Sequence, residues 1–423
     1  MLKKFLQIFK IKDLRRKILI VAFLLIVFRI LAAIPIPNID ISRLKDFLSA
    51  NQLFGFLNIF TGGALERLSV AMLGLGPYIT ATIILQLLTL ISPRLKAMYY
   101  EEGAAGQAKF NRWSRYLTVP LAGFQAYGFL NLLISQGIVS RLSLLGLLET
   151  VILVVAGSMI LMWLGELITE QKIGNGISIL IFAGIVARVP SGIKEAFLTY
   201  EPTRLLTYIL FILVSLLVIA GVVFINEGDR RIPINYAKRV RGIKMYGGVS
   251  SYLPIRVNQA GVIPIIFAIS ALLFPQFFAQ LAAVFSKDFS VKLTAIVNQF
   301  FNNQIIYMII YFILVVAFTY FYTAITFDPK EISRNLQRSG GFISGIRPGD
   351  NTSDFLSKIV NRVTFTGALF LGIIAILPHL TQLAAGVKSL SIGGTALLIV
   401  VSVALEIKNQ INAQLIMREY EEI

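Results

Sequence analysis

Residues able to do covalent or metal chemistry are scarce in this chain of 423 residues. It has no cysteine, which excludes disulfides and thiol catalysis, and its single histidine, His379, lacks the partners of a metal site. No phosphate loop of the GxxxxGK(S/T) type occurs, so we expect no nucleotide hydrolysis. An intramembrane enzyme would need a Ser-His pair or paired aspartates in its spans, and neither is visible. The sequence therefore predicts no enzyme, no cofactor and no metal.

The composition is that of a polytopic membrane protein. Hydrophobic residues make up 56% of the chain, charged residues 14%, and the mean hydropathy is +0.77, which is too apolar for a soluble domain of this size. Ionisable residues inside predicted spans, the usual markers of an ion or substrate path, are mainly Arg29, Glu149, Glu166 and Glu406. The interrupted spans described below hold none of them, which disfavours an ion-coupled transporter.

Ten apolar stretches are close to the ~20 residues that cross hydrocarbon. They lie at roughly 18–34, 73–91, 113–136, 144–168, 175–198, 204–226, 259–283, 303–325, 358–383 and 391–412. The net charge is +17, and most Lys and Arg fall at the N-terminus, in the even-numbered loops and in the C-terminal tail. This is the positive-inside pattern, and it predicts that both termini are cytoplasmic. A cleavable signal peptide is the competing interpretation of the first span, but its length and Arg29 favour an uncleaved helix.

Residues 54–91 predict a membrane segment that begins, breaks and begins again. The first part carries Gly62, Gly63 and the charged pair Glu66 and Arg67, so we expect a half-helix that does not span. The run 73–77 then supplies two glycines and a proline before an uncharged helix resumes. Such a break is tolerated in a membrane only where protein covers it or it lines a water-filled cavity. A related pattern recurs, with Gly74-x-x-Pro77-x-Ile79-x-Ala81 matching residues 261–268. The match indicates either an internal duplication or a chance similarity.

Two long basic loops are predicted on the cytoplasmic side, at 227–258 and 326–357. The first has partly alternating apolar residues and glycine turns, which favours a projecting hairpin that includes Arg239 and Arg241. The second opens with a helix start, in which Asp328 is the cap and Pro329 the first residue. Arg347 follows in a Gly-Ile-Arg-Pro-Gly turn, and taken alone it is better explained as an ordinary solvated charge. Basic loops near a membrane determine topology or contact anionic lipids, and structured ones also bind RNA phosphate or acidic proteins.

Several longer motifs occur in order along the chain. They are Ile34-Pro35-Ile36-Pro37, residues 60–65, 76–79, 174–178, 260–264, 345–349 and 393–395. Together, from about residue 13 to 412, they resemble the SecY family, the channel subunits of the bacterial protein translocase. One departure is Asn38, where the family usually has glycine, and asparagine also tolerates a left-handed turn.

The resemblance implies an all-α membrane protein with ten transmembrane helices in two inverted five-helix halves, 1–198 and 199–423, around a central pore. Residues 54–72 would be the plug, and spans two and seven would flank the lateral gate, with span three beside two and span eight beside seven. The family's pore ring would fall on Ile79, Ile83, Ile181, Ile185, Ile266 and Ile399. On periodicity alone, Ile181 and Ile185 are better explained as packing or lipid-facing residues.

The implied function is a protein-conducting channel in the inner (plasma) membrane, which passes unfolded secretory polypeptides and releases hydrophobic segments laterally into lipid. Arg239, Arg241 and Arg347 would dock the SecA motor ATPase or the ribosome, and the implied membrane partners are SecE and SecG. Anionic lipids are expected beside the basic segments. The alternative is a secondary transporter, since inverted repeats and broken helices serve that class too.

Overall fold

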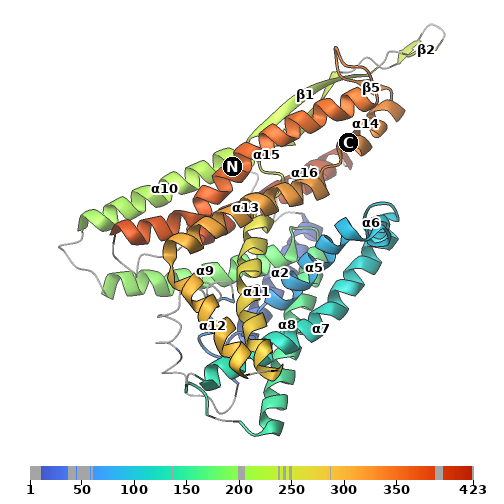
Figure 1. The fold of residues 1–423 in the computed structure, drawn as a ribbon. Helices are drawn as coiled ribbons and strands as arrows, with labels where there is room; N and C mark the ends of the chain where they lie inside the picture. The colour runs from blue at the N-terminus through green and yellow to red at the C-terminus, as the bar shows by residue number, and fades with distance from the viewer. Residues whose placement is uncertain are drawn as a thin grey trace. The chain divides into compact units, whose positions relative to one another are not determined.

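The structure is a computed structural model that describes residues 11–36, 44, 58, 61–135, 137–140, 142–198, 205–236, 239–241, 244–246, 250–285, 287–385 and 394–421 (Figure 1). The chain forms two compact units. The first comprises Met1–Pro202, Ile269–Asn303 and Val403–Ile423, and the second comprises Thr203–Ala268 and Gln304–Ser402. The predicted division into halves 1–198 and 199–423 stays a prediction.

The described part of the first unit is mainly helical. Its helices are α2 (Lys12–Leu31), α5 (Gly76–Ile91), α6 (Pro93–Tyr100), α7 (Gly103–Ser135), α8 (Leu144–Glu170), α9 (Gly176–Leu198) and α12 (Lys287–Asn302). The helices α11 (Ile263–Phe285) and α16 (Gly394–Glu421) each begin in the second unit and end in the first. In Figure 1, α7 and α8 lie side by side.

Local sequence explains where several of these helices begin. The Ser143 hydroxyl accepts from the Gly146 amide at the start of α8, and the Asn175 side chain accepts from the Ile177 amide at 3.0 Å at the start of α9. Both are N-cap bonds that satisfy an amide with no partner inside the helix. α5 begins with Gly76 and Pro77, and proline is favoured at this position because its missing N–H is not needed there.

The second unit combines long helices with short antiparallel sheets. Its elements are α10 (Leu205–Glu227), β1 (Asp229–Tyr236), β2 (Arg239–Arg241), β3 (Lys244–Tyr246), β4 (Ser250–Arg256), α13 (Gln304–Thr326), α14 (Pro329–Arg338), β5 (Gly341–Phe342) and α15 (Asp350–Ala385). The strands form one sheet in the order β4-β1-β5 and a second pair, β2-β3. Ile232 of β1 lies opposite Leu253 of β4 in the first sheet.

The two long loops predicted from the sequence, 227–258 and 326–357, pack together around a shared core. A core of buried apolar residues joins the sheet to the first turns of α15, and its members are Ile232, Ile255, Ile343, Leu356 and Val360. The predicted hairpin is confirmed by the pairing of β1 with β4. The Asp328 cap of α14 is confirmed as well, because its carboxylate accepts from the Lys330 amide at 2.8 Å.

The helices agree closely with the predicted spans. Each of the ten predicted spans falls on a helix of the described chain, and seven of the described helices are long and apolar enough to cross a membrane. Those seven are α7, α8, α9, α10, α13, α15 and α16. α5 and α6 form a pair bent by 114° at the break between them. The protein is therefore a mostly helical, multi-pass membrane protein, and the count of ten spans stays a prediction.

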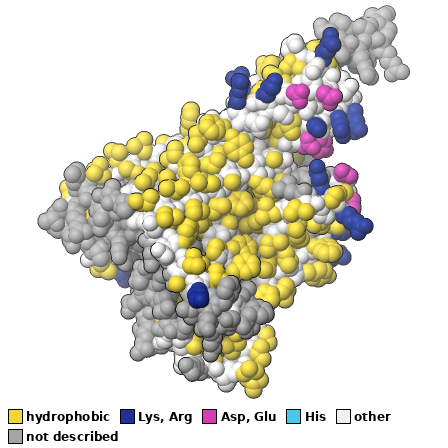
Figure 2. Space-filling model, in the orientation of Figure 1, with side chains coloured by type: hydrophobic (Ala, Val, Ile, Leu, Met, Phe, Trp, Pro, Cys, Tyr) yellow, Lys and Arg dark blue, Asp and Glu magenta, His cyan; other side chains and the backbone are white. Residues whose placement is uncertain are grey.

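Side chains of the second unit are sorted by type along its length. In Figure 2, Lys, Arg, Asp and Glu gather over the strands and α14, while hydrophobic side chains cover α13 and α10. Exposed apolar residues on these two helices include Ile209, Leu216, Ile309 and Ile313, each more than half exposed. Exposed apolar helix faces beside a charged end are expected where lipid meets water.

Candidate functional site

The predicted break before α5 is present, and we call residues 61–75 the turn segment. The segment is a chain of turns in place of the half-helix predicted from sequence. Its backbone has positive φ at Gly62 (65°), Gly63 (85°), Leu68 (41°) and Gly74 (57°), and left-handed residues cannot continue a right-handed helix. Positive φ at the three glycines is expected from the sequence, because glycine adopts it readily. Nothing in the sequence predicts positive φ at Leu68.

The stretch that follows α2 pairs with the turn segment. Ile36 donates its amide to the Leu68 carbonyl at 2.9 Å, and Val70 donates to the Ile34 carbonyl at 3.1 Å. Pro35 lies opposite Ser69 between these two bonds. Proline has no N–H to give, so alternation of isoleucine and proline leaves the pairing groups on the isoleucines. This explains the Ile-Pro-Ile run as a short pairing edge.

The apolar side chains of the turn segment are buried in the first unit. Leu65, Leu68 and Met72 are at most 2% exposed and belong to a cluster with α7 and α8 that includes Phe129, Leu130 and Val154. Two glycines, one in α8 and one in the turn segment, let the segment lie close to α8 and α9. A Cβ on Gly157 of α8 would lie 2.1 Å from the Val70 carbonyl oxygen, and a Cβ on Gly62 would lie 2.8 Å from Cα of Gly184 in α9. The segment is therefore fitted against α7, α8 and α9.

Polar side chains hold the same segment at two points. Arg29 of α2 donates from Nη1 to the Gly62 carbonyl at 2.9 Å. The Glu66 carboxylate accepts from Arg188 Nη2 of α9 at 3.2 Å and from Asn58 Nδ2 at 3.1 Å. Asn58 also accepts, through Oδ1, from the Glu66 amide at 3.0 Å. Arg29 and Glu66 stand out in the sequence as charges in apolar stretches, whereas the roles of Arg188 and Asn58 are not predictable from it.

The six isoleucines predicted as a ring are distributed over both units. Ile79 and Ile83 are one turn apart on α5, and Ile181 and Ile185 are one turn apart on α9 of the first unit. Ile266 of α11 and Ile399 of α16 belong to the second unit. All are buried except Ile79, which is partly exposed. Their convergence on one constriction stays a prediction.

The residues predicted to dock partners lie in the second unit. Arg347 is exposed, and its turn is fixed by positive φ at Gly345 (81°) and Gly349 (104°) and by a bond from the Thr352 hydroxyl to the Arg347 carbonyl at 2.9 Å. Asn235 of β1 donates to the Ser344 hydroxyl at 2.8 Å, which ties the hairpin to this turn. Arg239 and Arg241 pair through their backbones with Tyr246 and Lys244, and their side chains lie outside the described residues.

The other ionisable residues noted in the predicted spans do not gather into a site among the described residues. Glu166 of α8 accepts from Arg115 Nε of α7 at 2.7 Å, an ion pair that joins neighbouring helices. Glu149 is exposed on α8. His379 is 2% exposed, with its ring 5.0 Å from that of Tyr307. Within the part of the chain that the structure describes, no three His, Asp or Glu side chains could together hold a metal ion.

Known sequences and structures are similar to this chain over most of its length. A family model for SecY matches residues 69–408. The protein translocase subunit SecY of Thermotoga maritima is 44% identical, with 100% of this chain and 97% of the relative aligned, and that of Mycobacterium bovis is 41% identical, with 100% and 99% aligned.

Solved structures share the fold. A solved protein-conducting channel has a TM-score of 0.65 at 20% identity, covering 93% of this chain and 91% of its own. A structure concerned with the plug domain of the SecY protein, said to stabilise the closed state of the translocation channel, has a TM-score of 0.60 at 20% identity, covering 93% and 90%. Sec61 in a canine ribosome-channel complex has a TM-score of 0.61 at 19% identity, covering 93% and 91%.

Proposed function

Because the chain belongs to the SecY family, it is a protein-conducting channel, and we propose that it passes unfolded secretory polypeptides across the membrane and releases hydrophobic segments laterally into lipid. The observation that carries this proposal is the turn segment, a stretch of non-helical backbone packed among helices of the first unit. Irregular backbone in a membrane protein is tolerated where protein buries it or it lines a cavity. A plug segment meets this condition in the closed state, because the surrounding helices then bury its backbone.

We assign residues 54–72, which include the turn segment up to Met72, to the plug of this channel. Two side-chain contacts support the assignment, from Arg29 to Gly62 and from Arg188 to Glu66. They hold the segment without making it part of a helix, so it can separate from its neighbours when these contacts break. Of the residues 54–72, the structure describes 58 and 61–72. The remaining fold proposal is ten spans in two inverted halves, with α5, α7, α11 and α13 beside the lateral gate.

We assign the pore ring to Ile79, Ile83, Ile181, Ile185, Ile266 and Ile399. Branched apolar side chains exclude water from a narrow neck, and dewetting of this kind blocks ions. The same side chains offer a sliding polypeptide no hydrogen bond to hold it. The reaction is then a partitioning without covalent chemistry, in which a central Leu or Ile gains about 0.3 to 0.6 kcal/mol in lipid and a central charge loses about 2.5 to 3.5.

Partner docking is assigned to the sheet and turns of the second unit. The exposed Arg347, on a turn tied to β1 through Ser344, supports this role because a fixed cation can recognise an acidic surface or a phosphate. Arg239 and Arg241 would extend the same surface through β2. The proposed partners are the SecA motor or the ribosome on the cytoplasmic side, and SecE and SecG in the membrane.

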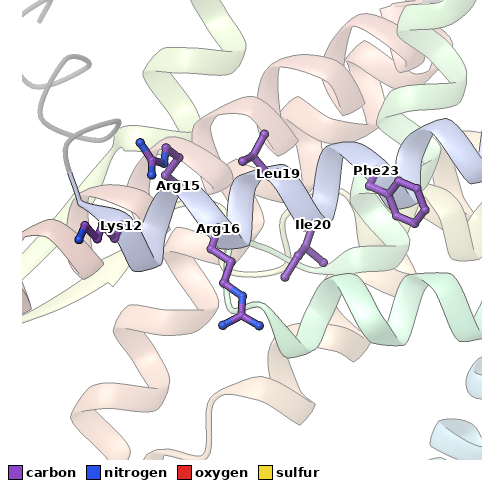
Figure 3. A pocket seen from close by; sticks show the side chains of 6 residues that line it. All are labelled: Lys12, Arg15, Arg16, Leu19, Ile20 and Phe23. Carbon is purple, nitrogen blue, oxygen red and sulfur yellow. The ribbon is translucent and has the colours of Figure 1, made fainter.

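An anionic lipid is proposed for the N-terminal part of α2. A groove of about 500 Å³ there is lined by Lys12, Arg15, Arg16, Leu19, Ile20 and Phe23 (Figure 3). The three cations lie within the first turns, and the apolar residues follow along the helix. A lipid phosphate beside the cations and an acyl chain along the apolar residues would match both parts. This arrangement also agrees with an inner-membrane location and a cytoplasmic N-terminus.

Reconstitution tests the function directly. We expect vesicles that hold the chain with its small membrane partners, given a motor ATPase and ATP, to protect a signal-bearing substrate from added protease. Vesicles without the chain should leave that substrate fully digested. A secondary transporter, which the family does not favour, would give ion-driven uptake of a small solute and no protected polypeptide.

A further inference from the structure

Two helices hold the turn segment through charged side chains, and the contacts come four residues apart. Arg29 of α2 contacts the Gly62 carbonyl, and Arg188 of α9 pairs with Glu66. Arg188 lies 122 residues after Glu66 in the sequence, so the pair closes a long loop. Each of the two contacts joins the segment to a different helix.

Gly62 shows how closely the first contact is fitted. A Cβ on this residue would lie 2.9 Å from Arg29 Nη1 and 2.8 Å from Gly184 Cα, and real Cβ atoms essentially never come so close. The residue also has φ of 65°, which side chains other than glycine seldom adopt. Only glycine therefore fits between α2 and α9 here, four residues before Glu66.

Asn58 helps to orient Glu66 toward Arg188. Asn58 contacts both its amide and its carboxylate, which leaves the carboxylate facing α9. The two side chains of the ion pair are 27% and 33% exposed, so water screens the pair only in part. Because the pair is partly buried, loss of one partner leaves the other charge poorly solvated, which costs more free energy than at a fully exposed pair.

We propose that Glu66 and Arg188 form a latch that positions the turn segment in its seated state, and that the segment must break this pair to leave. The proposal rests on the proposed function, in which the segment is the plug of the channel. Asn58, Gly62 and Arg29 are positioning residues that present Glu66 to the latch. The pair is expected to set how often the segment leaves its seat when no substrate is present.

The absence of cysteine from the chain gives a direct measurement. Ser69 is 0% exposed in the turn segment, so a Ser69→Cys variant carries one buried thiol as a reporter of the seated state. The variant is placed in lipid nanodiscs, and the rate of its reaction with a water-soluble maleimide is followed by mass spectrometry. Glu66→Arg and Arg188→Glu are each added singly and then together.

Each single reversal is expected to raise the labelling rate about tenfold, between the small effect of an exposed pair and the large effect of a buried one. The double variant restores an opposite-charge pair and should return the rate to within about threefold of the parent, as expected for two directly coupled residues. Glu102→Arg is the matched control, because Glu102 pairs with Lys109 at 3.0 Å elsewhere in the first unit. It should leave the rate unchanged.

Three results would overturn the latch: parental rates in both single variants, a double variant as reactive as the singles, or an equal rise with Glu102→Arg. The readout does not depend on transport. Protected import by the Ser69→Cys parent together with unchanged labelling in the singles would refute the latch and leave the channel intact. Coupled changes in labelling without any import by the parent would instead refute the function proposed for the segment.

Discussion

The α-carbon of Gly157 in α8 lies directly against the carbonyl of Val70 in the turn segment, where a Cβ would come within 2.1 Å of the oxygen. A backbone oxygen cannot move aside as a flexible side chain can, so the segment must shift as a whole if residue 157 grows. The position of the turn segment is therefore sensitive to a single methyl group added at residue 157.

Gly157→Ala should displace the turn segment and raise the ion conductance of the reconstituted channel without substrate. We expect a destabilisation of about 1 to 3 kcal/mol, the usual range for overpacking a filled interior. Gly123→Ala in α7 is the control, since a Cβ there would meet no atom within 4 Å. Equal conductance in both variants, with helix content unchanged, would contradict the tight seat.

Ile266→Asn should raise the conductance of the closed channel. The amide attracts water into the proposed neck and weakens its apolar packing, since truncation of a buried isoleucine is worth roughly 2 to 5 kcal/mol. The shift toward the open state should also improve export of substrates with defective signal sequences. Planar-bilayer recording checks the first effect, and Ile399→Asn should behave alike.

Ile26→Asn controls for a general defect of membrane helices, because Ile26 is 58% exposed on α2. Its conductance should match that of the parent. If Ile266→Asn and Ile399→Asn both stay at the parental conductance in folded protein, these residues do not belong to a pore ring.

Arg347→Glu should weaken motor-driven export while leaving the fold intact. The side chain is exposed and only its backbone is bound in the turn, so the free energy of unfolding should change by about 0.5 kcal/mol or less. Export into vesicles is measured with the motor limiting. Lys292→Glu, an exposed reversal on α12, serves as the control and should export normally. A parental export rate for Arg347→Glu would remove it from the docking surface.

Ser339→Cys tests the topology. Ser339 is the exposed C-cap of α14, in the loop predicted to be cytoplasmic. An impermeant thiol reagent should label it in inside-out vesicles and should fail to label it in intact cells. Labelling in intact cells would reverse the orientation predicted from the positive charges.

Sequence predicts the elements of this protein better than their contacts. The ten predicted spans fall on helices because length and apolar content determine a membrane helix without regard to its neighbours. Asp328 was predicted as a cap for a similar reason, since the cap bonds of α14 involve only the next few residues. α6 and α12 were not predicted, being a short helix and an amphipathic one.

The polar contacts of the turn segment depend on tertiary packing and could not be predicted. Arg188 reads in the sequence as an ordinary charge in a span, and only the folded first unit brings it to Glu66. Leu68 lies in the stretch predicted to be a half-helix, and leucine is a good helix former, yet its φ is 41°. Burial of its side chain among α7 and α8 accounts for this exception.

The pairing of Ile34 and Ile36 with the turn segment bears on how faithfully a displaced segment returns. A strand shifted by one residue would present Pro35 or Pro37 where an amide donor is needed, and neither proline has one. The misaligned pairing therefore lacks the bond that the Ile36 amide donates in the native alignment, and the native alignment is favoured. The two prolines thus restrict the pairing to a single register, so a turn segment that moves as proposed for the plug would return to the same alignment.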